Sequence, residues 1–288
     1  MDFRLSEEQT AILDTTRRFA RERVRPHVRH YDREERFPHD IYAELGALGL
    51  TGGVIPEQYG GAGMDYVTYS LMIMELAEVC QVMGAAASWA SGVGGISVLR
   101  FGTEEQKQRY LVPLAKGHGP VAFALTESHT GSDVASMKTR AVRDGDSYVL
   151  NGSKMWISMV GSCRWILTFA TVDVSAGRKG ITAFLLEPDW PGITRNPFKN
   201  KVGFRPMETG ELVLDNVRVP VENRLGAEGE GFAIAMSSVE SGRIGVASRC
   251  VGMTRACVEL ASDYAKTRVT FGEPIGRRQL VQSKITDM

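Results

Sequence analysis

The chain has 288 residues, 43% of them hydrophobic, which is enough to bury the cores of two or three domains. Its 34 Lys and Arg residues balance 34 Asp and Glu residues, so we expect no electrostatic attraction to nucleic acid or to an anionic membrane. No apolar run is long enough to span a bilayer, and acidic residues are mixed with the basic ones near the N-terminus, which excludes a targeting peptide and favours a cytoplasmic protein.

The four cysteines give no sign of a metal site. Cys80, Cys163, Cys250 and Cys257 are far apart or lie on different faces of a helix, and no CxxC pair is present. We therefore expect reduced thiols and no bound metal.

The first part of the chain, up to about residue 118, has the pattern of helices. Ser6 followed by Gln9, and Thr103 followed by Gln106, are capping boxes that each predict the start of a helix. A further helix is predicted over 40–48 and stops at Gly49, and a helical pattern runs from Tyr66 to about Arg100.

Two stretches of small residues occur within this predicted helical region. Residues 52–64 are rich in glycine and contain Pro56, so they predict a connecting loop; a phosphate cradle is the alternative, but the lysine of such a loop is missing. Residues 85–95 have almost no bulk except Trp89. Such a stretch suits either close helix packing or a slot for a thin apolar chain, and the sequence does not decide between them.

From Pro120 to about Gly226 the pattern changes to short strands. Strands are predicted over 121–125, 165–170, 181–186 and 211–220, and Asp144-Gly145 and Asn151-Gly152 each predict a tight turn. Trp156 and Ser158 are two apart on one strand, so their side chains share a face. No strand–GxGxxG–helix motif is present, which excludes nucleotide binding of the Rossmann type.

The helical pattern returns at about Glu230 and continues to about Arg268. Apolar and other residues step along one side of this predicted helix, at Phe232, Met236, Val239, Arg243, Val246 and Cys250. A helix this long is typical of a bundle. Another helix begins near Arg277 and reaches Met288 without a stop signal.

Several motifs in fixed order resemble the acyl-CoA dehydrogenase family. They are Thr126-Glu127, Gly131-Ser132-Asp133, Lys154-Met155-Trp156-Ile157-Ser158, Asn216 to Pro220, Asn223 to Gly226, Gly229-Glu230-Gly231, Arg268 to Gly272, and Gln279. The resemblance implies an α+β multi-domain fold with an N-terminal α-helical domain (1–118), a middle antiparallel β domain that binds flavin (119–226) and an incomplete C-terminal helical bundle (227–288).

The same resemblance implies FAD as the cofactor and names the residues that hold it. These are Phe123, Leu125, Thr126, Gly131, Ser132, Trp156, Ile157, Ser158, Arg268, Phe271 and Gln279, of which Arg268 and Gln279 reach the FAD of a neighbouring subunit. Hydroxyl donors such as that of Ser158 stabilise the negative charge of a reduced flavin. Without the resemblance, a tryptophan and loop hydroxyls in an ordinary β domain explain the same residues. The loop Ser128-His129-Thr130 departs from the family, which has smaller residues there.

For the substrate, an acyl-CoA, the resemblance implies contacts from Ser132, Glu240 and Arg243. A helical ion pair between Glu240 and Arg243 is the alternative. The reaction needs a carboxylate to take the proton next to the thioester. One family position for it is Gly242 here, which cannot act as a base, and the other position lies beyond Met288, so the catalytic residue is unknown.

The implied function is FAD-dependent α,β-dehydrogenation of an acyl-CoA, as in fatty acid metabolism, with an electron-transfer flavoprotein or a similar acceptor as partner. A homodimer or homotetramer is expected. Two alternatives stay open: a non-catalytic flavin- or acyl-CoA-binding subunit that needs a partner chain, and a flavin oxidase or monooxygenase on the same fold.

Overall fold

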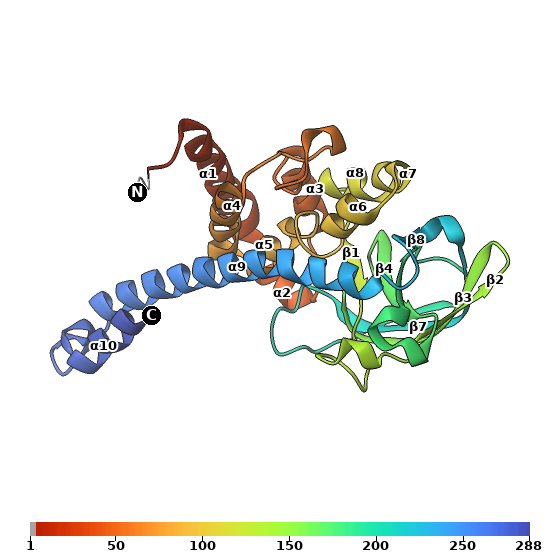
Figure 1. Cartoon of the computed structure of the whole chain (residues 1–288). Coiled ribbons are helices and arrows are strands. Elements are labelled where there is room, and N and C mark those ends of the chain that lie inside the picture. Colours follow the sequence, from red (N-terminus) through yellow and green to blue (C-terminus); the bar gives the residue numbers. More distant parts are fainter. Residues whose placement is uncertain (1–3) are drawn as a thin grey trace.

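A computed structural model describes residues 4–288 as a layer of helices beside a sheet, with one long helix running past both (Figure 1). The helical part comes first in the chain. Its elements are α1 (Glu7–Phe19), η1 (Ala20–Val24), η2 (Arg25–His27), α2 (Val28–Glu34), α3 (His39–Ala47), η3 (Glu57–Tyr59), α4 (Tyr66–Val79), α5 (Gln81–Ala87), α6 (Gly95–Phe101), α7 (Glu104–Gln106), η4 (Lys107–Leu111) and α8 (Val112–Ala115).

The predicted helix starts are confirmed, whereas the predicted length between Tyr66 and Arg100 is not. Both capping boxes form, and the Ser6 hydroxyl accepts a hydrogen bond from the Gln9 backbone N–H at 3.1 Å. The pattern from Tyr66 to Arg100 gives three helices, because Cys80 is extended (φ −151°) and Gly94 has a φ of 98°. A glycine adopts that positive φ without steric cost, so the chain turns there.

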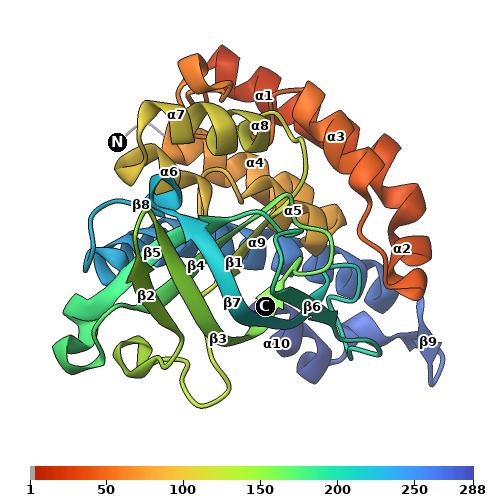
Figure 2. The ribbon, with the colours of Figure 1, turned by 90° about the vertical axis from the view of Figure 1, so that its right-hand side faces the viewer.

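The strands from β1 to β8 form one sheet. Figure 2 shows this sheet after a turn of 90° from the view of Figure 1. Its strands are β1 (Val121–Ala124), β2 (Arg140–Asp144), β3 (Ser147–Ser158), β4 (Trp165–Thr171), β5 (Ile181–Leu186), β6 (Ile193–Pro197), β7 (Thr209–Pro220) and β8 (Arg224–Leu225). The order is β6-β7-β3-β2-β4-β5-β8, and β1 also pairs with β4. Most pairs are antiparallel as expected, but β1–β4 and β2–β4 are parallel, so the sheet is mixed.

One of the two predicted turns is confirmed and the other is wrong. Asp144 pairs with Ser147 across a two-residue hairpin. Asn151 and Gly152 instead lie inside the long strand β3, where the register with β7 shifts. Gly152 has a φ of 150° and a Cβ there would lie 2.6 Å from the Thr139 hydroxyl, so the glycine serves a bulge and a close contact rather than a turn.

The long helix predicted near the C-terminus is confirmed as α9 (Gly231–Thr267), of 37 residues. Its deeply buried positions are mostly small, and they include Ser238, Gly245 and Gly252. A Cβ on Gly252 would lie 2.3 Å from the Met74 carbonyl oxygen, so small residues let α9 approach α4 closely. The chain ends with a short hairpin, β9 (Val269–Thr270) and β10 (Glu273–Pro274), the turn η8 (Ile275–Arg277) and α10 (Gln279–Asp287).

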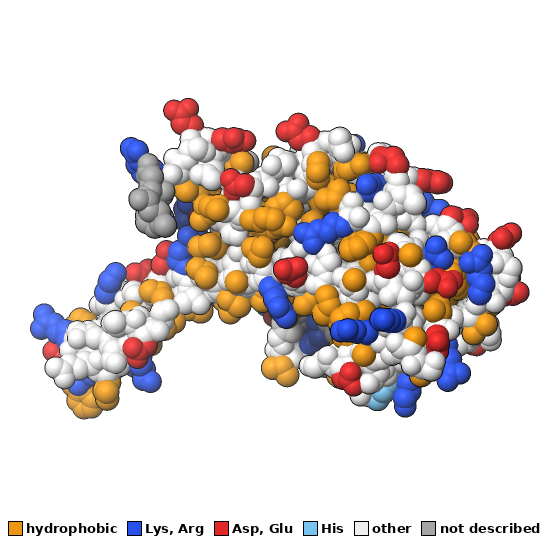
Figure 3. All heavy atoms as spheres, in the orientation of Figure 1, with side chains coloured by type: hydrophobic (Ala, Val, Ile, Leu, Met, Phe, Trp, Pro, Cys, Tyr) orange, Lys and Arg blue, Asp and Glu red, His pale blue; other side chains and the backbone are white. Residues whose placement is uncertain are grey.

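The surface carries no dominant charge. Figure 3 shows positive and negative side chains interspersed, with hydrophobic atoms gathered over the middle of the molecule. Within residues 4–288, no helix has the length and apolarity needed to cross a membrane. The four cysteines are all free thiols.

Candidate functional site

A cleft of about 450 Å³ lies between the sheet and the helices α5 and α9. The sheet side contributes Val121 and Phe123 of β1, Thr126, and Trp156 and Ser158 of β3, together with Phe204 and Met207 of the loop before β7. The helical side contributes Ala85, Ser88, Trp89, Val93, Val239, Gly242, Arg243, Val246 and Arg249. This volume is within the range of small-molecule sites.

Trp156 has an unusual backbone for so large a residue. Its φ is 64°, in the left-handed region, where the register of β3 with β7 shifts between Lys154 and Ile157. Its indole is 64% exposed and meets the Phe198 ring edge-on, with 5.5 Å between centroids. Bulky residues at positive φ are outliers that cost about 1–3 kcal/mol and are found mainly at functional sites.

Trp156 and Ser158 share one exposed side of β3, as predicted, while Ile157 between them is buried. The hydroxyls of Ser158 and Thr126 both face the cleft and have no hydrogen-bond partner among residues 4–288. A flat ring with two free hydroxyls nearby suits a planar ligand that carries polar atoms at its edge.

A buried ion pair fixes the loop that follows Thr126. The ammonium of Lys154 lies 2.8 Å from the Glu127 carboxylate and 3.2 Å from the Leu125 carbonyl oxygen. The same carboxylate accepts the backbone N–H groups of Lys138 at 2.7 Å and Thr139 at 3.0 Å. Glu127 thus joins both ends of the loop to β3, the strand that carries Trp156.

Burial shifts the pKa of both partners of this pair. It lowers the pKa of Lys154 to about 8, although Glu127 opposes the shift. Burial alone would raise the pKa of Glu127, but Lys154 and the hydrogen bonds outweigh it and hold that pKa below its usual range. At neutral pH the pair is therefore ionised on both sides.

The helical wall of the cleft depends on small side chains. Gly242 faces Gly92, with 3.5 Å between the Gly242 Cα and a Cβ built on Gly92, and Gly245 faces Ser88 and Tyr69 in the same way. Ala85 and Ser88 line the cleft, whereas their neighbours Ala86 and Ala87 pack in the core. Close helix packing of residues 85–95 is therefore confirmed, and the slot for a thin apolar chain stays a prediction.

The structure brings some of the predicted site residues together and separates others. Phe123, Thr126, Trp156, Ser158 and Arg243 line the cleft. The side chains of Leu125 and Ile157 are buried in the core, so only their backbone groups can meet a ligand. Gly131, Ser132 and Glu240 are exposed and lie outside the cleft lining. Arg268, Phe271 and Gln279 are exposed beyond the far end of α9 (Figure 1).

From the sequence we assigned no role to Glu127 or Lys154 and did not single out Arg249. The signal that could have found the pair is a lysine at an inward position of β3, in step with the buried Tyr148 and Leu150. For Arg249 the signal is a cation six residues after Arg243, on the side of α9 that also carries Val239 and Val246. Among the described residues, those lining the cleft include no Asp, Glu or His.

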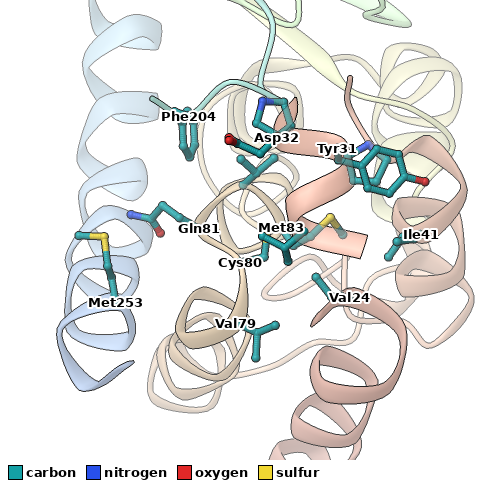
Figure 4. A pocket seen from close by; sticks show the side chains of 14 residues that line it. Val24, Tyr31, Asp32, Ile41, Val79, Cys80, Gln81, Met83, Phe204 and Met253 are labelled. Carbon is teal, nitrogen blue, oxygen red and sulfur yellow. The ribbon is translucent and has the colours of Figure 1, made fainter. Parts of the chain in front are cut away.

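A second cavity, of about 380 Å³, lies at the other end of α5 and shares Phe204 with the cleft (Figure 4). Its lining is almost wholly apolar and includes Val24, Ile41, Val79 and Met83. It contains none of the predicted site residues and no free hydroxyl comparable to Ser158. We therefore place the candidate site in the first cleft.

Three family models match the chain in order. They are the N-terminal, middle and C-terminal domains of acyl-CoA dehydrogenases, which match residues 6–118, 122–217 and 229–288. An acyl-CoA dehydrogenase of Bacillus subtilis (strain 168) is 42% identical over 284 residues, which are 99% of this chain and 75% of that protein.

Two solved structures are similar over the whole chain. A butyryl-CoA dehydrogenase from Megasphaera elsdenii has a TM-score of 0.93 at 38% identity, covering 100% of this chain and 76% of its own. A glutaryl-coenzyme A dehydrogenase in complex with glutaryl-CoA has a TM-score of 0.94 at 36% identity, covering 100% of this chain and 73% of its own.

Proposed function

This chain belongs to the acyl-CoA dehydrogenase family, and from this premise we propose that the cleft between the sheet and α9 is its flavin and substrate site. The protein is an oxidoreductase that uses FAD to dehydrogenate an acyl-CoA thioester between its α and β carbons. When bound, FAD supplies the acceptor for the hydride that leaves the β carbon.

The observation that carries the assignment is the exposed, strained Trp156 beside two hydroxyls that have no partner in the described part of the chain. A planar isoalloxazine fits against the open face of the indole, and Thr126 and Ser158 have hydroxyl protons free to donate to its polar edge. Donors in this position favour negative charge on the ring. The residues of the cleft therefore fit the cofactor.

We assign the remaining cofactor contacts as follows. Phe123 lines the cleft with its ring, Leu125 and Ile157 offer backbone groups, and Gly131 and Ser132 lie in the loop held by Glu127. Arg268, Phe271 and Gln279 are exposed, follow α9 in the chain and are absent from the lining of the cleft, which supports contacts to FAD in a second copy. This assignment implies a homodimer or homotetramer. A guanidinium such as that of Arg268 suits the FAD diphosphate.

On the substrate side, Arg243 projects from α9 at the exposed edge of the cleft, and we assign it, with Ser132 and Glu240, to the CoA thioester. Apolar contacts from Val239 and Val246 exclude water around the acyl group. We further propose an electron-transfer flavoprotein or a similar protein as the electron acceptor, and domain boundaries at 1–118, 119–226 and 227–288.

A second candidate function is favoured by one specific observation, which is that the cleft lining of residues 4–288 includes no carboxylate to remove the α proton. Under this alternative the chain binds flavin and acyl-CoA, and a partner chain supplies the base.

The test is to load the purified protein with FAD and to add short-chain acyl-CoA without oxygen. We expect the flavin absorbance to bleach if the chain is competent alone, and only on adding a partner chain under the alternative. Trp156→Ala should weaken FAD binding by about tenfold, since base–aromatic stacking contributes roughly 1–3 kcal/mol. Val142→Ala, an exposed change on β2, is the control. FAD binding that is the same in both variants would overturn the site assignment.

A further inference from the structure

Arg249 is a cation in the wall of the cleft that has no partner among the residues the structure describes. It lies on α9, is more than half-buried, and lines the cleft beside Ser88 and Val246. Within residues 4–288, no hydrogen bond or ion pair reaches its guanidinium, and its Nε is buried without an acceptor. Burial lowers the pKa of Arg249, yet an arginine stays protonated at any physiological pH.

Another arginine of α9 has acidic partners, as is typical of an arginine with a structural role. Arg255, six residues further along α9, is also partly buried, and it contacts Glu75 at 3.0 Å as well as Glu78. Because removing a charge from water is costly unless an opposite charge replaces the water, such pairing is the rule. Arg249 breaks this rule in the wall of the candidate cleft.

The surroundings of Arg249 are polar in a way that suits an anion. Tyr69 is fully buried, and its hydroxyl lies close to Gly245 and to Ser88. The Ser88 hydroxyl donates to the Ala85 carbonyl oxygen. A guanidinium with a tyrosine hydroxyl nearby can supply charge-assisted hydrogen bonds to a carboxylate.

Arg249 also lies at the correct end of the cleft for the tail of an acyl group. Gly242 faces Gly92, and Gly94, two residues after Gly92, lies against Val121 of β1. Gly245, further along α9, faces Ser88 instead. The wall from residue 242 to residue 249 therefore runs away from the sheet, and at 1.5 Å per residue it covers about 10 Å. Arg243 is near the flavin end and Arg249 near the opposite end.

Resting on the proposed function, we propose that Arg249 binds a carboxylate at the far end of the acyl group, so that the preferred substrates are CoA monothioesters of short dicarboxylic acids. The similar structures include enzymes named for both kinds of acyl-CoA, a butyryl-CoA dehydrogenase and a glutaryl-coenzyme A dehydrogenase, the latter in complex with glutaryl-CoA. A plain alkyl tail would leave the guanidinium buried and unpaired, whereas a terminal carboxylate neutralises it.

The experiment measures ligand affinity by calorimetry with the FAD-loaded protein. The probes are non-reacting thioether analogues of a dicarboxylic acyl-CoA and of the monocarboxylic acyl-CoA of equal length. We expect the wild type to bind the dicarboxylic analogue about 10- to 100-fold more tightly, the range for a hydrogen bond to a charged group. Arg249→Gln should remove this preference and leave the affinity for the monocarboxylic analogue unchanged or higher, and Arg249→Lys should keep part of it.

The control is Lys266→Gln, an exposed cation near the end of α9 that should change neither affinity. Equal affinity of the wild type for both analogues, or an equal loss of both in Arg249→Gln, would overturn the role of Arg249 while leaving the proposed function intact. If the wild type binds neither analogue, the proposed function itself fails. The wild-type comparison decides the question even if a variant does not fold.

Discussion

Replacing Lys154 by methionine tests the ion pair that holds the loop against β3. The Lys154 side chain is fully buried and its partner Glu127 is 4% exposed. Losing one member of a buried pair typically destabilises a protein by about 3–5 kcal/mol, because the other charge remains buried. Glu127 keeps two backbone N–H donors, from Lys138 and Thr139, so we expect the lower end, about 3 kcal/mol.

The assay is thermal unfolding followed by circular dichroism at neutral pH. A loss of this size should lower the melting temperature of Lys154→Met by about 10 °C. The double variant Lys154→Met/Glu127→Gln should recover part of the loss, because no unpaired charge is left. Lys138→Met, an exposed change in the same loop, is the matched control and should melt within about 2 °C of the wild type. If Lys154→Met melts like that control, the ion pair does not hold the loop.

Four further outcomes follow from the same structure. Because the pKa of Lys154 is lowered in the folded protein, the unfolded chain binds more protons above about pH 8. The free energy of unfolding of the wild type, measured by urea titration, should therefore rise relative to that of Lys154→Met between about pH 8 and pH 10. A constant difference between the two proteins over this range would contradict the prediction. Conversely, the lowered pKa of Glu127 stabilises the fold above its unfolded value, so acid should remove this contribution below about pH 4.5 in the wild type but not in the double variant. Trp156→Gly should stabilise the FAD-free protein by about 1 kcal/mol by relieving the positive φ, while weakening FAD binding; a loss of stability would show that the backbone is not strained. Glu75→Gln, which disturbs the contacts to Arg17 and Arg255, should cost about 1–3 kcal/mol in urea unfolding, against less than about 0.5 kcal/mol for the exposed control Asp14→Asn.

The ends of helices could be predicted from the sequence where residues a few positions apart determine them. The capping boxes at Ser6 and Thr103 and the stop at Gly49 are of this kind, and each lies where expected. The breaks at Cys80 and Gly94 flank α5, which contacts both α4 and α9, and no local pattern reports such contacts.

The sheet shows the same division between local and long-range information. The hairpin at Asp144-Gly145 formed because β2 and β3 are adjacent in the chain. Asn151-Gly152 has an equally strong turn signal, but pairing of β3 with β7, more than fifty residues later, overrides it. The parallel contact of β1 with β4 is likewise a long-range pairing.

For the candidate site, the motif residues Thr126, Trp156 and Ser158 were predicted from the sequence and do meet in one cleft. Their roles toward FAD stay predictions, as do those of the distal residues Arg268, Phe271 and Gln279. The importance of Arg249 could not be predicted, because a missing partner is visible only when every neighbouring side chain has been placed.

The exposed ring of Trp156 gives the protein an optical signal of its own. Of the four tryptophans, Trp89 and Trp165 are buried and Trp190 is partly buried, whereas Trp156 is largely open to solvent. An indole in water emits fluorescence at longer wavelengths than a buried one, so the red edge of the emission reports mainly on this single ring. Any flat molecule that settles on it will change that part of the spectrum first, which makes occupancy of the cleft measurable without a label.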